Sequence, residues 1–317
     1  MNPLVFPLLR CLSDGAFHSA AALAQRLGCS RHQIRRLLDE VPSHFALTLE
    51  CVPGRGYRMQ PTLEWLDAAV IQANLHYPLA LEVCESIDST NTALLQRPFR
   101  MSRTPLALFA ELQTAGRGRR GRRWLSTLGG ALTFSLRWSF SEGISRLSGL
   151  SLAVGVAIVR ALALFGVDVA LKWPNDVLLN GKKLAGVLIE VSGDAPNSTT
   201  AVIGVGINLR TLIGVEQAVA ALDEIAHPIG RNVLAVALLD ALYEVLSAFA
   251  TDGFRAWRSA WEQCHAYQAQ PVLLLPAQGD AIEGVALGVD DEGALRLQTA
   301  QGVQLFHVGD VSLRGMP

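Results

Sequence analysis

The spacing of apolar residues changes twice along this chain and divides its 317 residues into three parts. Residues 1–62 carry apolar side chains at helical spacing, followed by a short hairpin pattern. Residues 63–269 alternate long apolar runs with apolar helices, which predicts an α/β domain on a mixed sheet. Residues 270–317 hold short strand patterns between Gly- and Asp-rich turns, typical of a small β-barrel or sandwich. The predicted fold class is therefore α+β in three domains.

Apolar runs set the expected elements of the second and third parts. In the second part we expect strands over 106–110, 131–136, 167–171, 184–190 and 202–207, and helices over 147–164 and 232–251. In the third part we expect strands over 272–275, 282–289, 294–298, 303–308 and 311–313. The most apolar stretch, from Ser148 to Val159, ends at Arg160 and falls short of the ~18–20 residues that cross a membrane. It predicts a core helix and a protein without membrane contact.

Charge and cysteine content narrow the compartment and the partners. Residues 1–60 contain seven Arg and four Asp or Glu, whereas the whole chain carries a net charge of −1. A basic first part on a mildly acidic body suggests that this part meets an anion such as nucleic acid. The five cysteines are scattered without a CxxC pair, and the N-terminus lacks a signal-peptide pattern. We therefore expect a reduced, cytoplasmic protein without a structural metal.

The first part has the pattern of a winged helix-turn-helix. Two helices would meet at the turn Leu27-Gly28-Cys29-Ser30, and Ser30 would cap the second of them. That helix would place donors in a major groove, while Arg55 and Arg58 on the following hairpin would reach phosphates. The predicted DNA-binding residues are Ser30, Arg31, His32, Gln33, Arg35, Arg36 and Arg55. A small helical interaction domain with a solvated basic face is the alternative.

The strongest local motif is the run Gly116-Arg-Gly-Arg-Arg-Gly-Arg-Arg-Trp124, with five Arg in nine positions. Its three Gly let backbone N–H groups converge on an anion, and the guanidinium groups add charge and paired donors. The run lies between two apolar strands, which predicts an anion-binding loop that its ligand orders. A disordered nucleic-acid-binding tract and a solvated charged loop are the alternatives.

The second motif contains the only lysines of the chain. Lys172, Lys182 and Lys183 lie within twelve residues, whereas the other 24 basic residues are Arg. Such rare use of Lys suggests that a compact ammonium group is needed here. In Lys172-Trp-Pro-Asn-Asp176 the Pro favours a turn, and Asn175 and Asp176 offer oxygens suited to Mg²⁺ or a ribose. An ordinary hairpin with polar turn residues has the same pattern.

Two weaker motifs complete the set. In Gly204-Val-Gly-Ile-Asn208 small residues would let a ligand approach the backbone, although glycines in strands often mark bulges. Ser89-Thr90-Asn91 offers hydroxyl and amide groups, a pattern more typical of a helix cap. The sequence has no nucleophile–base motif, Walker loop or dinucleotide-binding motif. It instead gathers positive charge, which suits a reaction that holds a carboxylate and a triphosphate together.

The order of these motifs resembles that of the biotin–protein ligases over essentially the whole chain. The resemblance extends to Gln113-Thr-Ala-Gly before the arginine run and to Lys183-Leu-Ala-Gly after the lysine motif. The first and last parts resemble the bifunctional members that also repress the biotin operon, which implies a winged helix in front and a Src-homology-3-like barrel behind. The implied reaction has two steps. Biotin's carboxylate attacks the α-phosphate of MgATP, and a lysine of the biotin carboxyl carrier protein of acetyl-CoA carboxylase then attacks the adenylate.

The resemblance also implies roles for the residues that match the family's motifs. Lys183 and Arg119 would act in catalysis, and the biotin-binding residues would be Ser89, Thr90, Asn91, Gln113, Arg117, Gly118, Arg119 and Lys183. The ATP-binding residues would be Arg120, Trp124, Lys172, Asn175, Asp176 and Asn208, with Mg²⁺ held by ATP within reach of Asn175 and Asp176 rather than by a protein site alone. A ligand-promoted homodimer would bind the operator DNA of biotin synthesis genes.

Repressor-type relatives cover the adenine with an aromatic and aliphatic loop, and this chain departs from them after Asn208. The segment that follows carries no Trp, and Leu212, Ile213 and Val215 would fill this role instead. Two other functions fit parts of the sequence. One is lipoate–protein ligation, which shares the central fold, and the other is a metabolite-sensing transcription factor without ligase activity.

Overall fold

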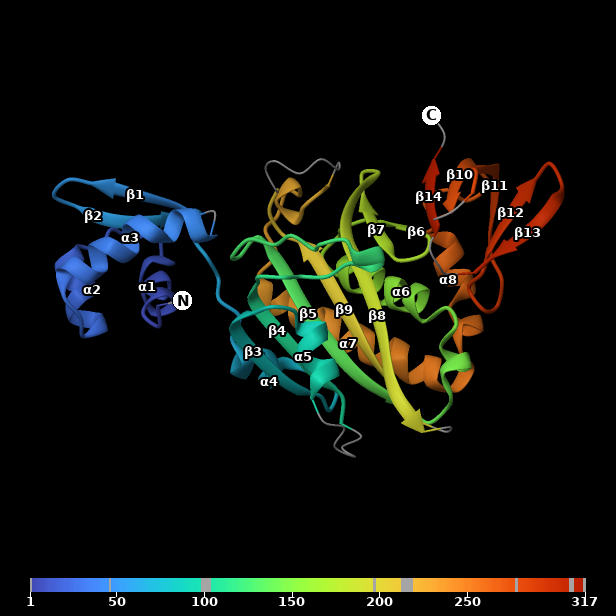
Figure 1. Ribbon diagram of the computed structural model, residues 1–317, viewed down its shortest axis with the longest axis horizontal. Helices are drawn as coiled ribbons and strands as arrows, with labels where there is room; N and C mark the ends of the chain where they lie inside the picture. The colour runs from blue at the N-terminus through green and yellow to red at the C-terminus, as the bar shows by residue number, and fades with distance from the viewer. Residues whose placement is uncertain are drawn as a thin grey trace.

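The computed structural model describes residues 2–45, 47–97, 104–195, 198–211, 219–276, 279–307 and 311–315. Three groups of elements follow one another along the chain: helices with a hairpin, a seven-stranded mixed sheet, and a five-stranded antiparallel sheet (Figure 1). This succession agrees with the predicted change of pattern along the sequence.

The first group consists of three helices and a hairpin: α1 (Val5–Leu12), α2 (Ala20–Leu27), α3 (Arg31–Phe45), β1 (Thr48–Val52) and β2 (Gly56–Gln60). Ser19 caps α2, because its hydroxyl accepts from the Ala22 N–H at 3.1 Å. Gly28 ends that helix with a left-handed φ of 62°. Ser30 then begins α3, with its hydroxyl accepting from the Gln33 N–H at 3.2 Å. Gly28 and Ser30 lie where the sequence predicted the turn and the cap.

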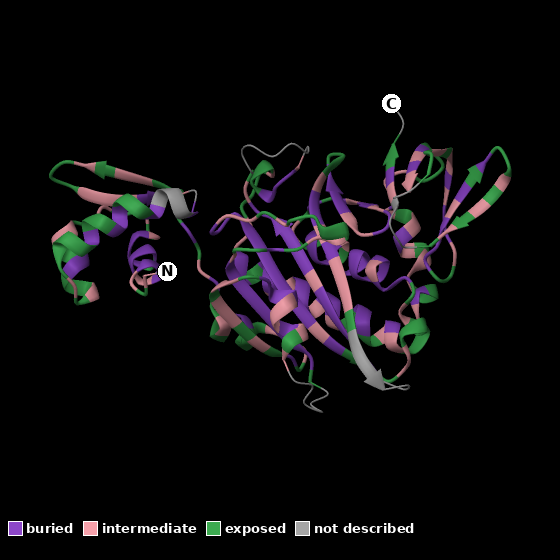
Figure 2. Ribbon diagram, viewed as in Figure 1, coloured by how far each residue is buried: buried purple, intermediate pink, exposed green. Residues whose placement is uncertain are grey.

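One face of α3 closes the small core of this first group. Ile34, Leu37 and Leu38 are buried in a cluster that includes Leu8 and Leu9 of α1. The polar positions between them face solvent, so α3 alternates buried and exposed bands along its length (Figure 2). The helix therefore presents a polar face outward.

The central sheet has the strand order β3-β4-β5-β9-β8-β7-β6, and only the β3–β4 pair is parallel. Its strands are β3 (Ala80–Ile87), β4 (Leu106–Gln113), β5 (Ala131–Phe140), β6 (Ala170–Lys172), β7 (Asp176–Leu179), β8 (Lys182–Ala195) and β9 (Ser198–Asn208). The expected mixed sheet is confirmed. β3 and β7 are additional to the predicted strands, and the strand expected over 167–171 is limited to β6.

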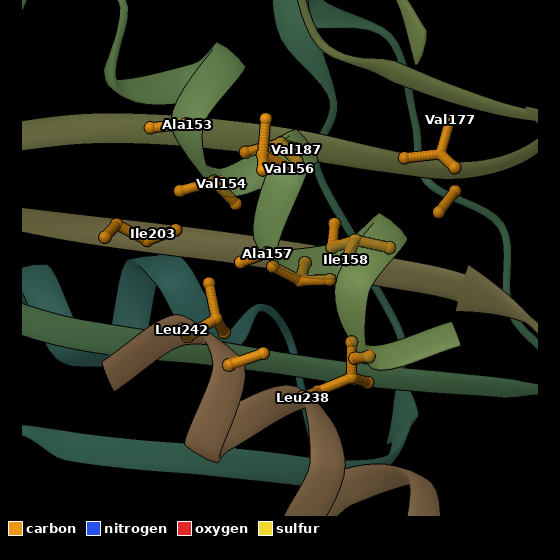
Figure 3. Packing of buried hydrophobic residues seen from close by; sticks show 14 of the residues in the cluster. Ala153, Val154, Val156, Ala157, Ile158, Val177, Val187, Ile203, Leu238 and Leu242 are labelled. Carbon is orange, nitrogen blue, oxygen red and sulfur yellow. The ribbon is translucent and has the colours of Figure 1, made fainter. Parts of the chain in front are cut away.

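Two long apolar helices, α6 (Leu150–Ala163) and α7 (Arg231–Asp252), pack against each other and against this sheet. Ile158 of α6, Leu242 of α7 and Ile203 of β9 belong to one buried core (Figure 3). The expected helices over 147–164 and 232–251 are thus confirmed with small shifts of their ends. Three shorter helices are α4 (Ala68–Asn74) and α5 (Thr90–Gln96), which contact the central sheet, and α8 (Arg258–Gln263), which contacts α6 and β11.

Two segments are long and apolar enough to cross a membrane when judged by length and composition alone. They are Ile144–Ala163 and Arg231–Asp252, and they correspond to the helices α6 and α7 with the residues just before α6. Half or more of each segment is buried in the fold. Both pack as core helices, which the interruption at Arg160 predicted for the first of them.

The third group is an antiparallel sheet with the order β13-β12-β11-β10-β14. Its strands are β10 (Pro271–Pro276), β11 (Ile282–Val289), β12 (Leu295–Thr299), β13 (Gly302–Phe306) and β14 (Val311–Gly315). All five lie where strands were expected. β13 and β14 form its two edges and are not paired with each other over the described residues, so the observed unit is an open sheet.

This sheet is joined to the central domain through buried aromatic residues. The indole N–H of the fully buried Trp173 donates to the Gly293 carbonyl at 3.1 Å. Nearby, His265 packs on Trp261 with ring centroids 4.5 Å apart. Burial lowers the pKa of His265 to about 4, and its Nε2 has no hydrogen-bond partner among the described residues. The imidazole is therefore neutral in the folded protein near pH 7.

Residues 62–67 connect the first group to the central sheet and are held along their length. Arg210 donates to the Thr62 carbonyl at 2.5 Å. The Leu63 side chain lies so close to Gly129 that a Cβ on this glycine would overlap it. Glu64 accepts from the Arg231 N–H at 2.6 Å and so satisfies the N-terminus of α7.

A buried ion pair of the central domain also bonds to the backbone of this connection. Arg231 and Glu111 lie 2.6 Å apart, with 6% and 0% of their side chains exposed. Glu111 also accepts from the Leu66 N–H at 2.7 Å, and Arg231 donates to the Glu64 carbonyl at 2.7 Å. The backbone of residues 62–67 therefore supplies hydrogen-bond partners to buried charged groups of the central domain.

Candidate active site

One cavity of about 480 Å³ opens between the central sheet, the arginine-rich loop and the C-terminal sheet. All fourteen residues predicted to bind biotin or ATP line it: Ser89, Thr90, Asn91, Gln113, Arg117, Gly118, Arg119, Arg120, Trp124, Lys172, Asn175, Asp176, Lys183 and Asn208. Four separate sequence motifs thus meet at one place. The volume is typical of a site for a small-molecule ligand.

The arginine-rich run forms a short hairpin over this cavity. The Gly118 N–H donates to the Arg122 carbonyl at 2.8 Å, and the Trp124 N–H donates to the Gly116 carbonyl at 2.9 Å. At its tip Arg120 has a left-handed φ of 61°. The run therefore folds as a hairpin that lines the cavity, while Arg117 and residues 120–123 remain exposed.

Trp124 forms part of the cavity wall. Its ring lies on Gly206 of β9, where the Cβ of any larger residue would overlap the indole. The Trp124 Nε1–H lacks a hydrogen-bond partner among the described residues although it is buried. A buried donor without a partner costs free energy, and a ligand acceptor in the cavity would remove that cost. Gly206 is thus small because an aromatic ring covers it.

Two arginines attach the hairpin to opposite sides of the cavity. Arg117 donates to Thr92 Oγ1 at 3.2 Å and to Glu190 Oε1 at 2.6 Å. Arg119 donates to Asn175 Oδ1 at 3.0 Å, on the turn between β6 and β7. The hairpin therefore spans the cavity from α5 and β8 to that turn.

Two lysines and one carboxylate form the charged end of the cavity. Lys183 Nζ lies 2.5 Å from Asp176 Oδ1, and Lys172 Nζ lies 3.4 Å from Asp176 Oδ2. Asp176 holds both ammonium groups in place but balances only one of their charges. Asn208, nearby, donates from Nδ2 to the Ala220 carbonyl at 3.0 Å. One positive charge is left for an anionic ligand, before the arginines are counted.

Hydroxyl and amide groups line the other end. Gln113 Oε1 accepts from the Thr90 N–H at 2.8 Å and lies 3.1 Å from the Thr90 hydroxyl. Thr90 Oγ1 also lies 2.6 Å from Ser135 Oγ, which donates to Asn91 Oδ1 at 2.5 Å. Ser89 caps α5, as its sequence pattern suggested, and lines the cavity as well. This end therefore suits a neutral ligand group with donors and acceptors of its own.

The oxygens suited to Mg²⁺ are already engaged by neighbouring side chains. No group of three or more His, Cys, Asp or Glu side chains that could hold a metal occurs in the part of the chain that the structure describes. Asn175 Oδ1 accepts from Arg119, and both oxygens of Asp176 face lysines. One carboxylate and one amide suit a Mg²⁺ ion that arrives already bound to phosphates.

The predicted DNA-binding residues belong to the first group of elements and not to this cavity. They lie at the start and on the exposed face of α3 and on the β1–β2 hairpin. Ser30 and Gln33 bond to each other at the start of α3, so both already serve as caps. The guanidinium of Arg55 stacks on Phe17 at 4.2 Å from the ring centroid. Arg58, expected to reach phosphates, instead contacts Glu50 at 2.6 Å. Arg58 would therefore have to exchange this carboxylate on the paired strand for a phosphate.

Several residues of the cavity were not predicted. They are Arg122, Arg123, Leu125, Phe134, Val187, Leu188, Val219, Ser312 and Leu313, together with Ser135 and Glu190 in its polar network. Ser135 carried a signal, since it follows Thr133 at strand spacing in an otherwise apolar run. Leu212, Ile213 and Val215, expected to cover the adenine, lie outside the described residues.

Comparison with protein families finds two matches on this chain. The pattern of the biotin/lipoate A/B protein ligase family matches residues 83–208. The pattern of the biotin protein ligase C-terminal domain matches residues 270–314. The first match includes most of the cavity, and the second includes the sheet that supplies Ser312 and Leu313.

Comparison with individual proteins extends the similarity to nearly the whole chain. The bifunctional ligase/repressor BirA of Salmonella typhimurium is 36% identical over 97% of this chain and 96% of its own. That of Escherichia coli is 34% identical over 99% of this chain and 98% of its own. The structure of biotin protein ligase from Aquifex aeolicus in complex with biotin and ATP is 30% identical, with a TM-score of 0.65, over 75% of this chain and 99% of that one.

Proposed function

Because this chain belongs to the biotin protein ligases of the biotin/lipoate A/B protein ligase family, we propose that it is a biotin–protein ligase that forms biotinyl-5′-AMP and transfers biotin to a lysine of a carrier protein. The observation that carries this proposal is one cavity, which joins a charged end with lysines to a neutral polar end under an arginine hairpin. Biotin and ATP differ in the same way, since one has a neutral ring system and the other a triphosphate.

In the first step an oxygen of biotin's carboxylate forms a bond to the α-phosphorus of ATP, and the bond to pyrophosphate breaks. The negative charge that builds up around phosphorus needs preorganised positive partners. Lys183 is the partner that we assign to this step, because Asp176 holds its ammonium group at the charged end of the cavity. Pyrophosphate leaves with Mg²⁺, which enters as part of the substrate MgATP.

The neutral end of the cavity would hold the ring system of biotin. Gln113 uses its carbonyl oxygen for Thr90, so its amide N–H groups are left for a ligand acceptor. Ser89, Asn91, Arg117 and Gly118 complete this group, and Arg119 extends from it toward the carboxylate. The ATP-binding group consists of Arg120, Trp124, Lys172, Asn175, Asp176 and Asn208.

In the second step the unprotonated amine of the carrier lysine attacks the carbonyl carbon of the adenylate, and AMP leaves. The arginine hairpin contributes by keeping the mixed anhydride away from water until the carrier arrives. Relatives named biotin–[acetyl-CoA-carboxylase] ligase support the biotin carboxyl carrier protein of that enzyme as the acceptor. Such a carrier, like MgATP, is cytoplasmic, which agrees with the scattered cysteines.

We further propose that the chain represses biotin synthesis genes as a ligand-promoted homodimer. Relatives named bifunctional ligase/repressor match it from end to end. The first 60 residues carry seven Arg against four acidic residues, and α3 turns a polar face outward beside a two-stranded wing. These features suit a winged helix-turn-helix on operator DNA. The closure of the C-terminal sheet into a Src-homology-3-like barrel belongs to the same family-based proposal.

The test of ligation combines the protein with biotin, MgATP and a carrier domain, and then weighs the carrier. We expect the carrier's mass to increase by one biotinyl group only when both substrates are present. Pyrophosphate exchange into ATP should likewise depend on biotin. If lipoate supports the exchange and biotin does not, the protein is a lipoate ligase. If neither acid supports it, the α/β domain is a sensor and not an enzyme.

A further inference from the structure

Glu190 is a carboxylate beside the cavity that none of the sequence motifs contains. It lies on β8, with 22% of its side chain exposed. Oε1 accepts from the Arg117 guanidinium at 2.6 Å, and Oε2 accepts from Asn91 Nδ2 at 2.9 Å. One side chain thus holds both a residue of the hairpin and a residue of the cavity wall. We propose that Glu190 is a positioning residue that fixes the closed hairpin and the polar wall of the biotin end together.

The hairpin side of this contact is an ion pair with a directional hydrogen bond. Arg117 is about half exposed, and Thr92 supplies its other described side-chain partner at 3.2 Å. A hydroxyl alone is a weak anchor for a guanidinium, whereas a charge-assisted bond is roughly twice as strong as a neutral one. Glu190 is therefore the main anchor of the hairpin on the α5 side of the cavity.

The wall side of the contact sets the direction of a chain of hydrogen bonds. An ionised carboxylate only accepts, so the NH₂ group of Asn91 must face Glu190 and its oxygen must face Ser135. Ser135 then donates to Asn91 and turns a lone pair toward Thr90, whose backbone N–H orients Gln113. Glu190 thus determines, through Asn91, which groups of the wall donate and which accept.

Packing holds the Asn91 side chain in one place. Its amide lies against Gly204 of β9, where a Cβ would overlap it, and only 4% of the residue is exposed. The side chain can therefore exchange its oxygen and nitrogen but cannot move away. An amide in place of Glu190 could accept from Asn91 or from Arg117 with its one oxygen, but it would present hydrogens to the other.

The effect should fall on biotin and not on ATP, because Glu190 lies in the network of the neutral end. This inference rests on the proposed ligase function. Loss of a hydrogen bond to a charged group predicts that Glu190→Gln weakens biotin binding about tenfold or more. The Michaelis constant for ATP should change less than about twofold, because Lys172, Asp176 and Lys183 are untouched. A role in folding alone would give no such separation.

Glu82→Gln is the matched control. Glu82 is also a strand carboxylate of the central sheet and pairs with Arg97 at 2.7 and 2.8 Å, but it does not line the cavity. Biotin affinity would be measured by calorimetry without ATP, and the ATP constant by pyrophosphate exchange. We expect Glu82→Gln to match the wild type in both. The double variant Arg117→Met/Glu190→Gln should lose less than the sum of its single changes, because the two residues share one contact.

Two outcomes overturn the proposal: biotin affinity in Glu190→Gln equal to that of Glu82→Gln, or equal losses for biotin and ATP. If Glu190→Gln does not fold, Glu190→Asp is measured in its place. It keeps the charge but shortens the reach, so unchanged biotin affinity there also counts against the proposal. A wild-type protein that binds no biotin would instead remove the proposed function, and this inference with it.

Discussion

At the scale of single residues, Asp176 is notable because its one carboxylate pairs with two ammonium groups. Lys183 lies 2.5 Å and Lys172 3.4 Å from its two oxygens. The carboxylate keeps both lysines near each other in the absence of ligand, and their mutual repulsion is released when phosphates arrive. Preorganisation of this kind is what electrostatic catalysis requires.

Replacement of Lys183 tests this arrangement. Lys183→Ala removes a positive charge next to the reacting oxygen, so we expect adenylate formation to slow by about 10²–10³-fold. The measurement is the rate of biotinyl-adenylate formation in a single turnover. Lys182→Ala is the control, because Lys182 is the exposed neighbour and does not line the cavity. Wild-type rates in Lys183→Ala would remove Lys183 from the mechanism.

His265 makes a prediction about pH at the same scale. Its pKa is lowered by burial to about 4 from 6.5, so as pH falls the unfolded chain binds the proton first. Its contribution to stability is complete above about pH 7 and is lost between about pH 6.5 and pH 4. His265→Phe keeps the packing on Trp261 but cannot bind the proton. Between pH 7 and pH 5 its free energy of unfolding should therefore fall by about 2 kcal/mol less than that of the wild type.

Urea unfolding at the two pH values measures this difference. The exposed His227→Phe serves as the control and should keep the wild-type dependence on pH. If His265→Phe loses as much stability as the wild type over this range, other groups are responsible for the acid sensitivity.

The residues of the site could be predicted where their chemistry is contiguous in sequence. The arginine run and the Lys172–Asp176 motif can each be recognised from nine consecutive residues or fewer. Glu190 and Ser135 could not be found in this way, because strand pairing alone brings them to Asn91. Ser135 is opposite Gly204 on β9, and Glu190 is 99 positions from Asn91 in the chain. Their role depends on register, which sequence patterns of single strands do not contain.

At the scale of elements, the arginine hairpin is held on both sides of the cavity, by Arg117 on one side and by Arg119 on the other. Arg119→Gly removes the anchor to Asn175 and adds backbone freedom at the hairpin's tip. We expect the adenylate to escape from this variant and to biotinylate unrelated proteins. Biotin incorporated into albumin measures the escape. Only Lys172, Lys182, Lys183 and the N-terminal amine can accept biotin on the enzyme itself.

Arg255→Gly is the control for this change, because the Arg255 side chain is 82% exposed and does not line the cavity. It should label no more albumin than the wild type does. Labelling by Arg119→Gly at the wild-type level would mean that the hairpin does not retain the adenylate.

Elements were predictable from sequence where apolar periodicity was strong and the strands were central. β5, β8 and β9 and the helices α6 and α7 belong to this class. β3 was missed because it is an edge strand whose exposed and half-buried residues alternate without a clear apolar face. β7 was missed because its four residues directly follow a turn that dominated the pattern. Both strands depend on their neighbours rather than on their own composition.

At the scale of the whole molecule, DNA binding and ligation should be coupled through dimerisation. The small basic first group (residues 1–62) of one chain offers few contacts to a DNA duplex. Specific binding therefore needs the first groups of two chains, spaced to reach successive major grooves. A ligand that the dimer binds more tightly must shift the equilibrium toward the dimer. We expect biotin with ATP to increase both the sedimentation coefficient and the retention of the protein's own biotin promoter.

The same measurements on a chain that begins at Leu63 separate the two activities. This chain should remain a ligase and lose DNA binding, since the family matches begin at residue 83. A full-length protein that stays monomeric with both substrates and ignores the promoter at moderate salt would contradict the repressor half of the proposal. The first group would then serve only to stabilise the ligase.

The order of the three parts could be predicted from sequence, but their docking could not. It depends on pairs such as Arg10 with Glu85 and Arg258 with Asp291, which are 75 and 33 positions apart. Each of these residues is an ordinary charged or polar residue when considered alone.

The linker has a practical consequence for any shortened form of the protein. Leu63 is 6% exposed and belongs to a cluster with Leu112 and Leu128 of the central domain. A chain that begins at Leu63 keeps this cover, whereas a chain that begins at Ala68 leaves both leucines open and the Glu111–Arg231 pair without its backbone partners. Open apolar surface promotes aggregation. The first form should stay soluble at high concentration, and the second should precipitate although its catalytic residues are complete.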